Sequence, residues 1–455
     1  MLKGLTGRKA AAIGGGFARH GVTTVLVTAA TMALGLLTGI LVARTIGPEG
    51  RGALTAVLTT IQMLGWLFGM GCGKAVTYAL SRDHSAGGRL LSTWVLILLP
   101  LAGLAIATGY LLLPLLLAAQ PVQTLELARL YLPMIAMALL AELMLGLILG
   151  DQDFRSFNAL NFIQPAGVAT LYAILWVAGH FTVEAAVIVQ AAMSTLVLVV
   201  ATVLLVRRHG IGRPDPALGR QTVWYALRTH GDVVGGVITQ RLDLLIIPAF
   251  LPAVQVGLYA LATSLSWLIV SLSSALATVV MPAATRRGQS GRALVLNSLQ
   301  VTFAIGGLLG GGLFVFADIA IGLVYGASFA DSALPLRLLL PGAVLYAAAS
   351  ILLNGLYAEN RPFTATMANL LGMLVTLGGL LLFLRSGGIL AAAIVSTVAY
   401  TLVFATAATL YRRATGLPWR VFLPDPAILA ALPRRLLALA KPSPATAAPA
   451  GPAGK

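Results

Sequence analysis

The sequence predicts an all-α, polytopic membrane protein with about 12 transmembrane helices. Of its 455 residues, 58% are apolar and only 10% are charged, and the mean hydropathy is +0.93. Soluble globular proteins are about 45–50% apolar and about 25% charged. A membrane-spanning helix needs about 20 apolar residues, so the apolar share suffices for about a dozen spans.

Apolar runs of about 20 residues or more follow one another along the chain, and each can cross about 30 Å of hydrocarbon as a helix. They cover residues 22–43, 56–80, 91–113, 130–149, 159–179, 185–206, 233–251, 256–281, 294–317, 335–357, 363–384 and 389–411. A strand barrel is disfavoured, because no ten-residue pattern of alternating hydrophobicity recurs. We expect the first run to be retained, since it is too long for the apolar core of a signal peptide.

The net charge of +16 predicts the orientation of the spans. Lys and Arg total 30. Of these, 23 lie in the N-terminus, in the tail and in the loops expected on the same side of the membrane as the two termini. The segments on the opposite side hold 5. Cytoplasmic segments are enriched in Lys and Arg, so both termini are expected in the cytoplasm. The charge is thereby explained without nucleic acid, and no nucleic-acid partner is expected.

The two halves of the sequence resemble each other. Gly52 aligns with Gly257 at an offset of 205, in two turns that each contain a proline and begin a long helix. Two further matches follow in the same order at offsets of 208 and 206, namely 129–133 with 337–341 and 153–157 with 359–363. This spacing predicts two six-helix halves of the same orientation, related by an axis along the membrane normal. Shared membrane composition is the alternative explanation.

The spans and the charged loops set the expected domain boundaries. They are a cytoplasmic N-terminus (1–21), an N-terminal six-helix lobe (22–206), a basic cytoplasmic linker (207–232), a C-terminal six-helix lobe (233–411) and a cytoplasmic tail (412–455). Within the tail, 427–441 fits either a basic interfacial helix or a solvated segment. The Pro/Ala-rich end from Pro442 is expected to be disordered.

No recognisable constellation supports catalysis, so the chain is not expected to be an enzyme. The five histidines are dispersed, and the patterns HExxH, G-x-S-x-G and Walker A do not occur. Cys72 is the single cysteine, which excludes an internal disulfide and does not make a metal site. We therefore expect neither a metal nor a cofactor.

Charged residues within spans are candidates for function, because a charge at the bilayer centre costs about 2.5–3.5 kcal/mol on insertion scales. Asp243 and Glu142 are the candidate coupling carboxylates. Thr239, Gln240 and Asp243 share one face of the seventh run, and this polar stripe suits the wall of a hydrated cavity. Arg241 points about 160° away from Asp243, so it needs a partner on another helix or reaches an interface.

Asn161, Gln300 and Asn354 are further polar residues within spans. With Arg241, Gln240 and Thr239 they make up the candidate substrate and cavity residues. For a lone Asn or Gln, a hydrogen bond between packed helices is the alternative explanation.

Several stretches of the chain resemble the Wzx-type polysaccharide flippases, which export O-antigen and teichoic-acid precursors. The residues that carry the resemblance are LVARTIGPEGRG (41–52), QRLDLLIIP (240–248), VGLYALA (256–262), LRLLLP (336–341), NGLY (354–357) and NRP (360–362). These flippases belong to the superfamily of multidrug, oligosaccharidyl-lipid and polysaccharide transporters. The resemblance covers about residues 22–411.

The resemblance implies two six-helix lobes around a central cavity in a bacterial inner membrane. Such a protein flips a polyprenyl-diphosphate-linked oligosaccharide from the inner to the outer leaflet by alternating access, with ion or proton coupling. Arg241 would meet the diphosphate, because a guanidinium matches phosphate oxygens. Asp243 or Glu142 would carry the coupling. The implied partners are the lipid-linked oligosaccharide, membrane lipid and other polysaccharide-assembly proteins.

Two other functions stay open at this point. A multidrug or small-metabolite exporter of the same superfamily would need aromatic cavity walls, and the aromatic content of 7% disfavours it. A membrane glycosyl polymerase or ligase would carry a large outer loop, whereas the longest expected outer loop is about 318–334.

Overall fold

The computed structural model describes residues 3–287, 289–359 and 361–424, without the side chains of 3–22, 24–25, 231–239, 272–287, 289–290 and 362. This part of the chain is helical almost throughout and contains no strand, as the sequence predicts. The helices are α1 (Lys3–Phe68), α2 (Cys72–Arg82), α3 (Gly87–Leu116), α4 (Val122–Tyr131), α5 (Met134–Gly150), α6 (Phe154–Val177), α7 (Val183–His209), α8 (Pro216–Phe250), α9 (Ala253–Arg287), α10 (Gln289–Val324), α11 (Ala333–Ala358) and α12 (Pro362–Thr415). Short 3-10 turns lie at His84–Ala86, Ala327–Ser332 and Trp419–Phe422.

The twelve expected crossings are present. In the described residues, eight helices are long and apolar enough to span a membrane, and α4 with α5, bent by 43°, makes a ninth. The apolar parts of α1 and α12, 43 and 53 residues long, exceed the roughly 20 residues of one crossing. Each helix is interrupted by a glycine of positive φ, Gly47 (64°) and Gly388 (54°), and forms a hairpin. The two hairpins and the 35-residue helix α8 bring the crossings to twelve.

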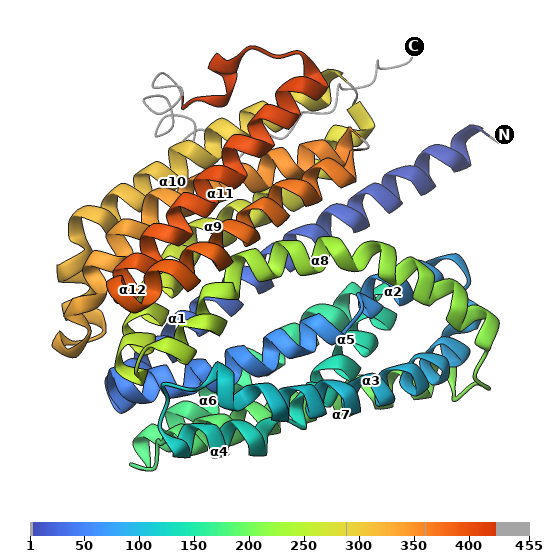
Figure 1. Ribbon diagram of the computed structural model, residues 1–455. Helices are drawn as coiled ribbons and strands as arrows, with labels where there is room; N and C mark the ends of the chain where they lie inside the picture. The colour runs from blue at the N-terminus through green and yellow to red at the C-terminus, as the bar shows by residue number, and fades with distance from the viewer. Residues whose placement is uncertain (1–2, 288, 360, 425–455) are drawn as a thin grey trace, which may run out of the picture.

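The helices gather into two lobes (Figure 1). Helices α2–α7 form one lobe and α9–α12 the other, while α1 and α8 run between them (Figure 1). Each lobe has its own buried side chains, such as Trp94 and Ile135 in the first and Tyr259 and Leu352 in the second. Ala43 of α1 belongs to the core of the second lobe, so the first crossing joins the two lobes.

The two ends of the bundle differ in what they contain. One end holds the turns at Gly47 and Gly388 and is called the outer end below, after the orientation that the sequence predicts. The opposite end, called the inner end, holds the loops around 83–86, 151–153 and 210–215. The inner loops of the N-terminal lobe meet there, because Nε2 of His209 lies 2.7 Å from Oδ2 of Asp151 and Arg208 forms an ion pair with Asp153.

The expected linker 207–232 is mostly helical. Helix α7 continues to His209 and α8 already begins at Pro216, which leaves 210–215 as the connection. Asp215 is the N-cap of α8, since its Oδ1 accepts hydrogen bonds from the backbone N–H groups of Ala217 and Leu218. A capping Asp followed by Pro at the first helical position is a strong start signal. The predictions for 427–441 and for the end from Pro442 concern residues outside the described ones.

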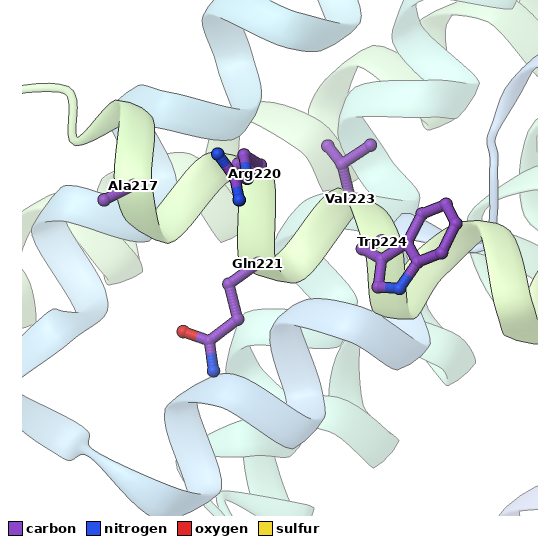
Figure 2. Close-up of a pocket in the computed structure, with 5 residues that line it drawn as sticks. All are labelled: Ala217, Arg220, Gln221, Val223 and Trp224. Atoms are coloured by element: carbon purple, nitrogen blue, oxygen red, sulfur yellow. The ribbon is translucent and has the colours of Figure 1, made fainter.

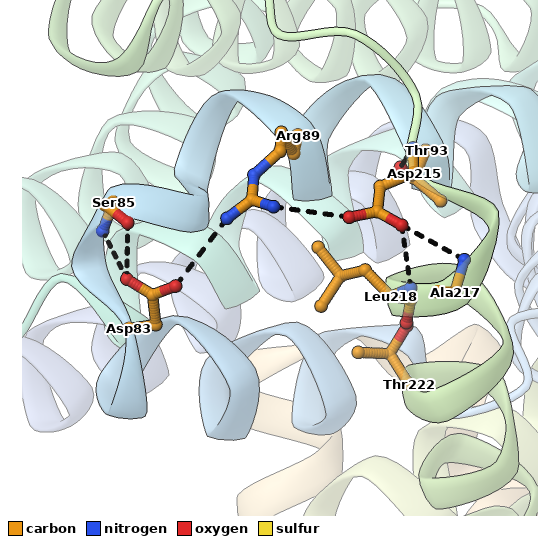
Figure 3. Close-up of polar contacts among 8 residues, drawn as sticks. All are labelled: Asp83, Ser85, Arg89, Thr93, Asp215, Ala217, Leu218 and Thr222. Atoms are coloured by element: carbon orange, nitrogen blue, oxygen red, sulfur yellow. Dashed lines mark hydrogen bonds and ion pairs between the residues drawn. The ribbon is translucent and has the colours of Figure 1, made fainter.

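The start of α8 is fixed to the N-terminal lobe through Asp215 (Figure 3). Arg89 of α3 lies between two carboxylates, 3.2 Å from Asp215 and 3.7 Å from Asp83. The backbone N–H of Asp215 donates to Oγ1 of Thr93 over 2.9 Å. The seventh crossing therefore begins on the N-terminal lobe, although its sequence repeat places it in the C-terminal half.

We expect Asp153→Ala to destabilise the inner end by about 1 kcal/mol, the usual cost of losing an N-cap. Asp153 accepts a hydrogen bond from the backbone N–H of Ser156. Partial burial acts to raise the pKa of Asp153, but the hydrogen bonds from Ser156 and the charge of Arg208 outweigh it and lower the pKa to about 2.

A lowered carboxylate pKa stabilises the fold above the unfolded value of about 3.9, and this contribution is lost as the pH falls toward 2. Thermal unfolding in detergent between pH 7 and pH 3 measures the effect. The gap between wild type and Asp153→Ala should narrow as the pH falls, and a gap that does not change with pH would contradict this role.

Candidate functional site

At the outer end, the two lobes touch backbone to backbone. A Cβ atom added to Gly52 would lie 1.8 Å from the carbonyl oxygen of Ala253, and one added to Gly257 would lie 1.9 Å from that of Pro48. Pro48 and Ala253 are 205 residues apart, as are Gly52 and Gly257. The contact is therefore symmetric about the axis that relates the two halves, and it leaves no room for a side chain at either glycine.

Arginines of the N-terminal half reinforce this contact. Arg51 is only 7% exposed. Its Nη1 donates to the carbonyl oxygen of Gly39, its Nη2 lies 3.4 Å from Oγ of Ser264, and its guanidinium carbon lies 5.9 Å from the ring centroid of Tyr325. Arg44 donates through Nε to the carbonyl oxygen of Val324 over 2.7 Å. Both arginines thus tie the first half to helices of the second.

A glutamine completes the outer closure. Nε2 of Gln120, in the connection between α3 and α4, donates to the carbonyl oxygens of Pro248 and Leu251 over 3.0 and 2.8 Å. These carbonyls lie where α8 ends, since Leu251 is the residue after its last turn.

Ion pairs among the described side chains do not join the two lobes at either end, since Arg337 at the outer end pairs with Asp318 of the same lobe. Within the described side chains, each pair at the inner end joins segments of one lobe and its linker. The C-terminal lobe has the pair Arg292–Glu359, with Nε 2.8 Å from Oε1. The N-terminal lobe has the pairs around Asp151, Asp153 and Arg89 described above. The lobes are thus tied to each other at the outer end, while the ion pairs at the inner end hold each lobe together.

Asp243 lies in the interior of the C-terminal lobe and is 3% exposed. Its Oδ2 accepts a hydrogen bond of 2.6 Å from the hydroxyl of Tyr259 and lies 3.4 Å from Oγ of Ser396, while the N–H of Leu244 donates to Oδ1. These partners come from α8, α9 and α12. The polar stripe predicted for the seventh run therefore turns Asp243 into the packed lobe, where other helices complete its hydrogen bonds.

Arg241 and Gln240 also face α9–α12. The guanidinium carbon of Arg241 lies 5.0 Å from the ring centroid of Trp267 in α9, so its partner is on another helix. Gln240 donates to the hydroxyl of Tyr346 over 2.8 Å. The side chain of Thr239 lies outside the described residues.

The second crossing is broken where Glu142 packs against it. Helix α1 ends at Phe68 and α2 begins at Cys72, and Met70 between them has a φ of 52°, which costs strain in a residue with a side chain. Oε1 of Glu142 lies 3.4 Å from the backbone N–H of Gly73. The carboxylate thus lies at the N-terminus of α2, where the helix dipole favours negative charge.

Glu142 also lies in a groove of about 600 Å³ at the inner half of the N-terminal lobe. The groove is lined by residues of α2, α5, α6 and α8, which are Gly73, Lys74, Thr77, Tyr78, Ser81, Glu142, Leu145, Gly146, Leu149, Phe157 and Tyr225. The rings of Tyr78 and Tyr225 stack at 4.5 Å with an interplanar angle of 3°. The guanidinium carbon of Arg82 lies 5.6 Å from the Tyr78 ring centroid.

The side chains of the remaining sequence candidates each donate to backbone carbonyl oxygens. The amide groups of Asn161 and Asn354 donate to the carbonyl oxygens of Phe157 and Ser350 one turn earlier. Gln300 donates to the carbonyl oxygens of two residues beyond α12, which are Val421 and Leu423. These three side chains and the Asp243 group are not brought together into one site.

A second pocket, of about 660 Å³, borders the first turns of α8. Figure 2 shows the side chains that line it, Ala217, Arg220, Gln221, Val223 and Trp224, projecting from this one helix. Trp224 is 59% exposed, and the guanidinium carbon of Arg228 lies 5.1 Å from one of its ring centroids. Exposed Trp beside Arg is typical of a membrane–water interface.

The outer closure and the groove were not predicted from the sequence. Arg44 and Arg51 are two of the five Lys and Arg residues expected on the side opposite the termini, and Gln120 carries no signal of its own. The signal for the closure was present, because Gly52 and Gly257 are the first aligned pair of the repeat. The groove had a weaker signal in the glycine-rich segment FGMGCGK at 68–74. The signal is weak because the same residues are apolar enough for the interior of an uninterrupted span.

Known proteins resemble this chain in sequence and in fold. One curated relative is "Probable low-salt glycan biosynthesis flippase Agl15" of Haloferax volcanii, which is 22% identical over 270 residues. That match covers 57% of this chain and 56% of the relative, so the chain spans little more than half the length of the relative it matches.

Solved structures match over nearly the whole chain. "Lipid II flippase MurJ, inward closed conformation" has a TM-score of 0.75 at 16% identity and covers 93% of this chain and 94% of its own. A MATE family multidrug transporter in its inward-facing conformation has a TM-score of 0.70, at 16% identity and with 87% and 98% covered. An outward-facing MATE structure has a TM-score of 0.58, at 14% identity and with 88% and 97% covered. The chain therefore has the same twelve-helix, two-lobe fold as these solved structures.

A family model described as "Polysaccharide biosynthesis protein" matches residues 17–287. The match covers more than half of the chain, and it includes the first six crossings, the connection at 210–215 and the whole of α8. The chain therefore belongs to this family of polysaccharide biosynthesis proteins.

Proposed function

We propose that the protein flips a polyprenyl-diphosphate-linked oligosaccharide from the inner to the outer leaflet of a bacterial inner membrane. The observation that carries the proposal is the asymmetry between the two ends. The lobes are tied together at Gly52 and Gly257, whereas the described ion pairs at the inner end join segments of one lobe and its linker. In alternating access, the binding site opens to one side of the membrane at a time. Lobes that are joined at the outer end and not at the inner end are expected when the site is open to the inner side.

Membership of the polysaccharide biosynthesis family supports a glycan substrate. The relative in Haloferax volcanii is itself named as a probable glycan biosynthesis flippase. The higher TM-score with the inward-facing than with the outward-facing MATE structure supports the assignment of the conformation. Both termini would be cytoplasmic, because 23 of the 30 Lys and Arg residues lie on that side.

In this proposal Asp243 couples transport to an ion or a proton. It is a carboxylate buried beneath Tyr259 and Ser396, so a change in its charge alters the packing between α8, α9 and α12. Arg241 lies two residues away, over the ring of Trp267. The partners are the lipid-linked oligosaccharide, membrane lipid and other polysaccharide-assembly proteins, and no reaction is catalysed.

Removal of the protein from cells tests the function. We expect a lipid-linked glycan to accumulate on the cytoplasmic leaflet while surface glycan falls, and chemical analysis of the accumulated lipid would identify the substrate. The fold is shared with MATE multidrug transporters, so an exporter of small molecules is the competing function. That function predicts normal surface glycan and greater sensitivity of the cells to toxic compounds.

A further inference from the structure

The groove around Glu142 has two chemically different walls. Leu145, Leu149 and Phe157 form an apolar wall from α5 and α6. The facing helix α2 contributes Lys74 and Ser81, both exposed. The volume of about 600 Å³ lies within the usual range for small-molecule sites, about 300–1,000 Å³.

The groove adjoins the broken second crossing. Non-helical backbone within a membrane span is tolerated where it is covered by protein or lines a polar cavity, and broken spans mark the binding sites of many transporters. Met70 holds its positive φ at this break, and Glu142 meets the first turn of α2 just beyond it. The break and the groove are separate observations that point to the same place.

The groove carries few charges. Among its lining residues, Lys74 is the one cation and Glu142 the one anion, and Arg82 lies beside the groove on the Tyr78 ring. Two cations next to one anion are little charge for a diphosphate, whose oxygens form several charge-assisted hydrogen bonds. An isoprenoid tail fits it no better, because an apolar chain would remove the two charged side chains, Lys74 and Glu142, from water.

Sugar rings match both walls. A pyranose ring has hydroxyl groups around its edge and a patch of C–H groups on its face, so one molecule can bond to polar groups and pack on apolar ones. The Tyr78–Tyr225 stack adds aromatic surface with hydroxyl groups at its rim, and tyrosine combines both properties in one side chain.

We propose that this groove binds sugar rings of the lipid-linked glycan, as a subsite separate from the one that holds the diphosphate. The proposal rests on the proposed flippase function and adds a location for the glycan. The groove lies in the inner half of the N-terminal lobe, on the side where the glycolipid enters. Tyr78 and Tyr225 contact the sugar, and the apolar wall at Leu145, Leu149 and Phe157 excludes water from its C–H face.

The test is a binding titration of the purified full-length protein in detergent with two probes. One is undecaprenyl diphosphate that carries a disaccharide, and the other is undecaprenyl diphosphate alone. We expect Tyr78→Ala to weaken binding of the glycosylated lipid by about tenfold, which corresponds to about 1.4 kcal/mol. Binding of the bare lipid should not change, and Tyr78→Phe, which keeps the ring and loses only the hydroxyl, should weaken binding of the glycosylated lipid less than Tyr78→Ala does.

Tyr110→Ala is the matched control. Tyr110 is 53% exposed with Arg129 over its ring at 4.9 Å, and Tyr78 is 42% exposed with Arg82 over its ring, but Tyr110 lies outside the groove. The control should bind both probes as wild type does. The proposal is overturned if Tyr78→Ala binds the glycosylated lipid normally, or if it loses both probes equally.

Binding of the two probes by the wild-type protein distinguishes a failure of the proposed sugar subsite from a failure of the proposed function. If it binds both lipids with equal affinity, the sugar subsite is wrong while the flippase function stands. If it binds neither probe, the proposed function fails together with the subsite.

Discussion

Gly52→Ala is expected to reduce glycolipid flipping by about tenfold or more, because the outer ends of the lobes cannot then meet. The added Cβ would lie 1.8 Å from the carbonyl oxygen of Ala253 and 2.7 Å from its carbonyl carbon, so the backbone itself must move. Overpacking of this kind costs about 1–3 kcal/mol, and each 1.4 kcal/mol shifts an equilibrium about tenfold. Gly257→Ala should act equally, since its Cβ would meet Pro48 in the same way.

The direction of this effect is distinctive. In a helix, replacing glycine by alanine ordinarily stabilises by about 0.5–1 kcal/mol, so a loss of activity must come from the contact between the lobes. Gly307→Ala is the control, because a Cβ there meets no atom within 4 Å. Distances between spin labels at the outer ends should lengthen in both closure variants and stay unchanged in the control. Wild-type distances and flipping in Gly52→Ala would refute the closure.

Asp243→Asn is expected to leave the protein folded and to abolish coupled transport. Asparagine keeps an oxygen that can accept the hydrogen bond from Tyr259, but it cannot change its charge. Typical coupling free energies are about 1–3 kcal/mol, a factor of about 5–150 in affinity, so the stimulation of flipping by a gradient should be lost. The measurement is flipping in vesicles, with and without an imposed ion or proton gradient, at matched protein levels.

Asp243→Ala tests the contribution of the carboxylate to stability separately from its role in coupling. It removes the acceptor that lies 2.6 Å from the hydroxyl of Tyr259 and leaves that hydroxyl with the longer contact of 3.2 Å to Oγ of Ser396, and the loss of a buried hydrogen-bond partner costs about 1–3 kcal/mol. We therefore expect Asp243→Ala to lower the thermal stability, whereas Asp243→Asn does so much less. Normal surface glycan at normal protein levels in both Asp243→Asn and Arg241→Ala would rule out these two residues as functional.

The sequence predicted the features that depend on composition and local spacing. Twelve runs, two halves and an all-α fold follow from apolar length and from the repeat, and the structure contains all three. The break at Met70 was missed because the residues on both sides are apolar enough to continue a span. Helix α8 begins before the apolar run at 233–251, because the Asp215–Pro216 cap starts the helix within the basic segment.

The site could be predicted only in part, because it depends on contacts between distant segments. The helical wheel placed Asp243 on a polar stripe, but only the structure supplies Tyr259 and Ser396, whose hydroxyls lie at its carboxylate within the lobe. Tyr78 and Tyr225 have no sequence signal that connects them. Gly52 and Gly257 are the exception, since an internal repeat brings equivalent positions to a common axis.

The central claim, that closure between Gly52 and Gly257 alternates with opening, has one direct test. Glu49 and Val254 are exposed residues next to Pro48 and Ala253, so cysteines at these two positions in a Cys72→Ala background can be joined by a short cross-linker across the outer end. The two single-cysteine variants, treated with the same reagent, are the controls. We predict that flipping in vesicles stops on cross-linking and returns on cleavage of the linker. Flipping at the wild-type rate in the cross-linked protein would contradict the account.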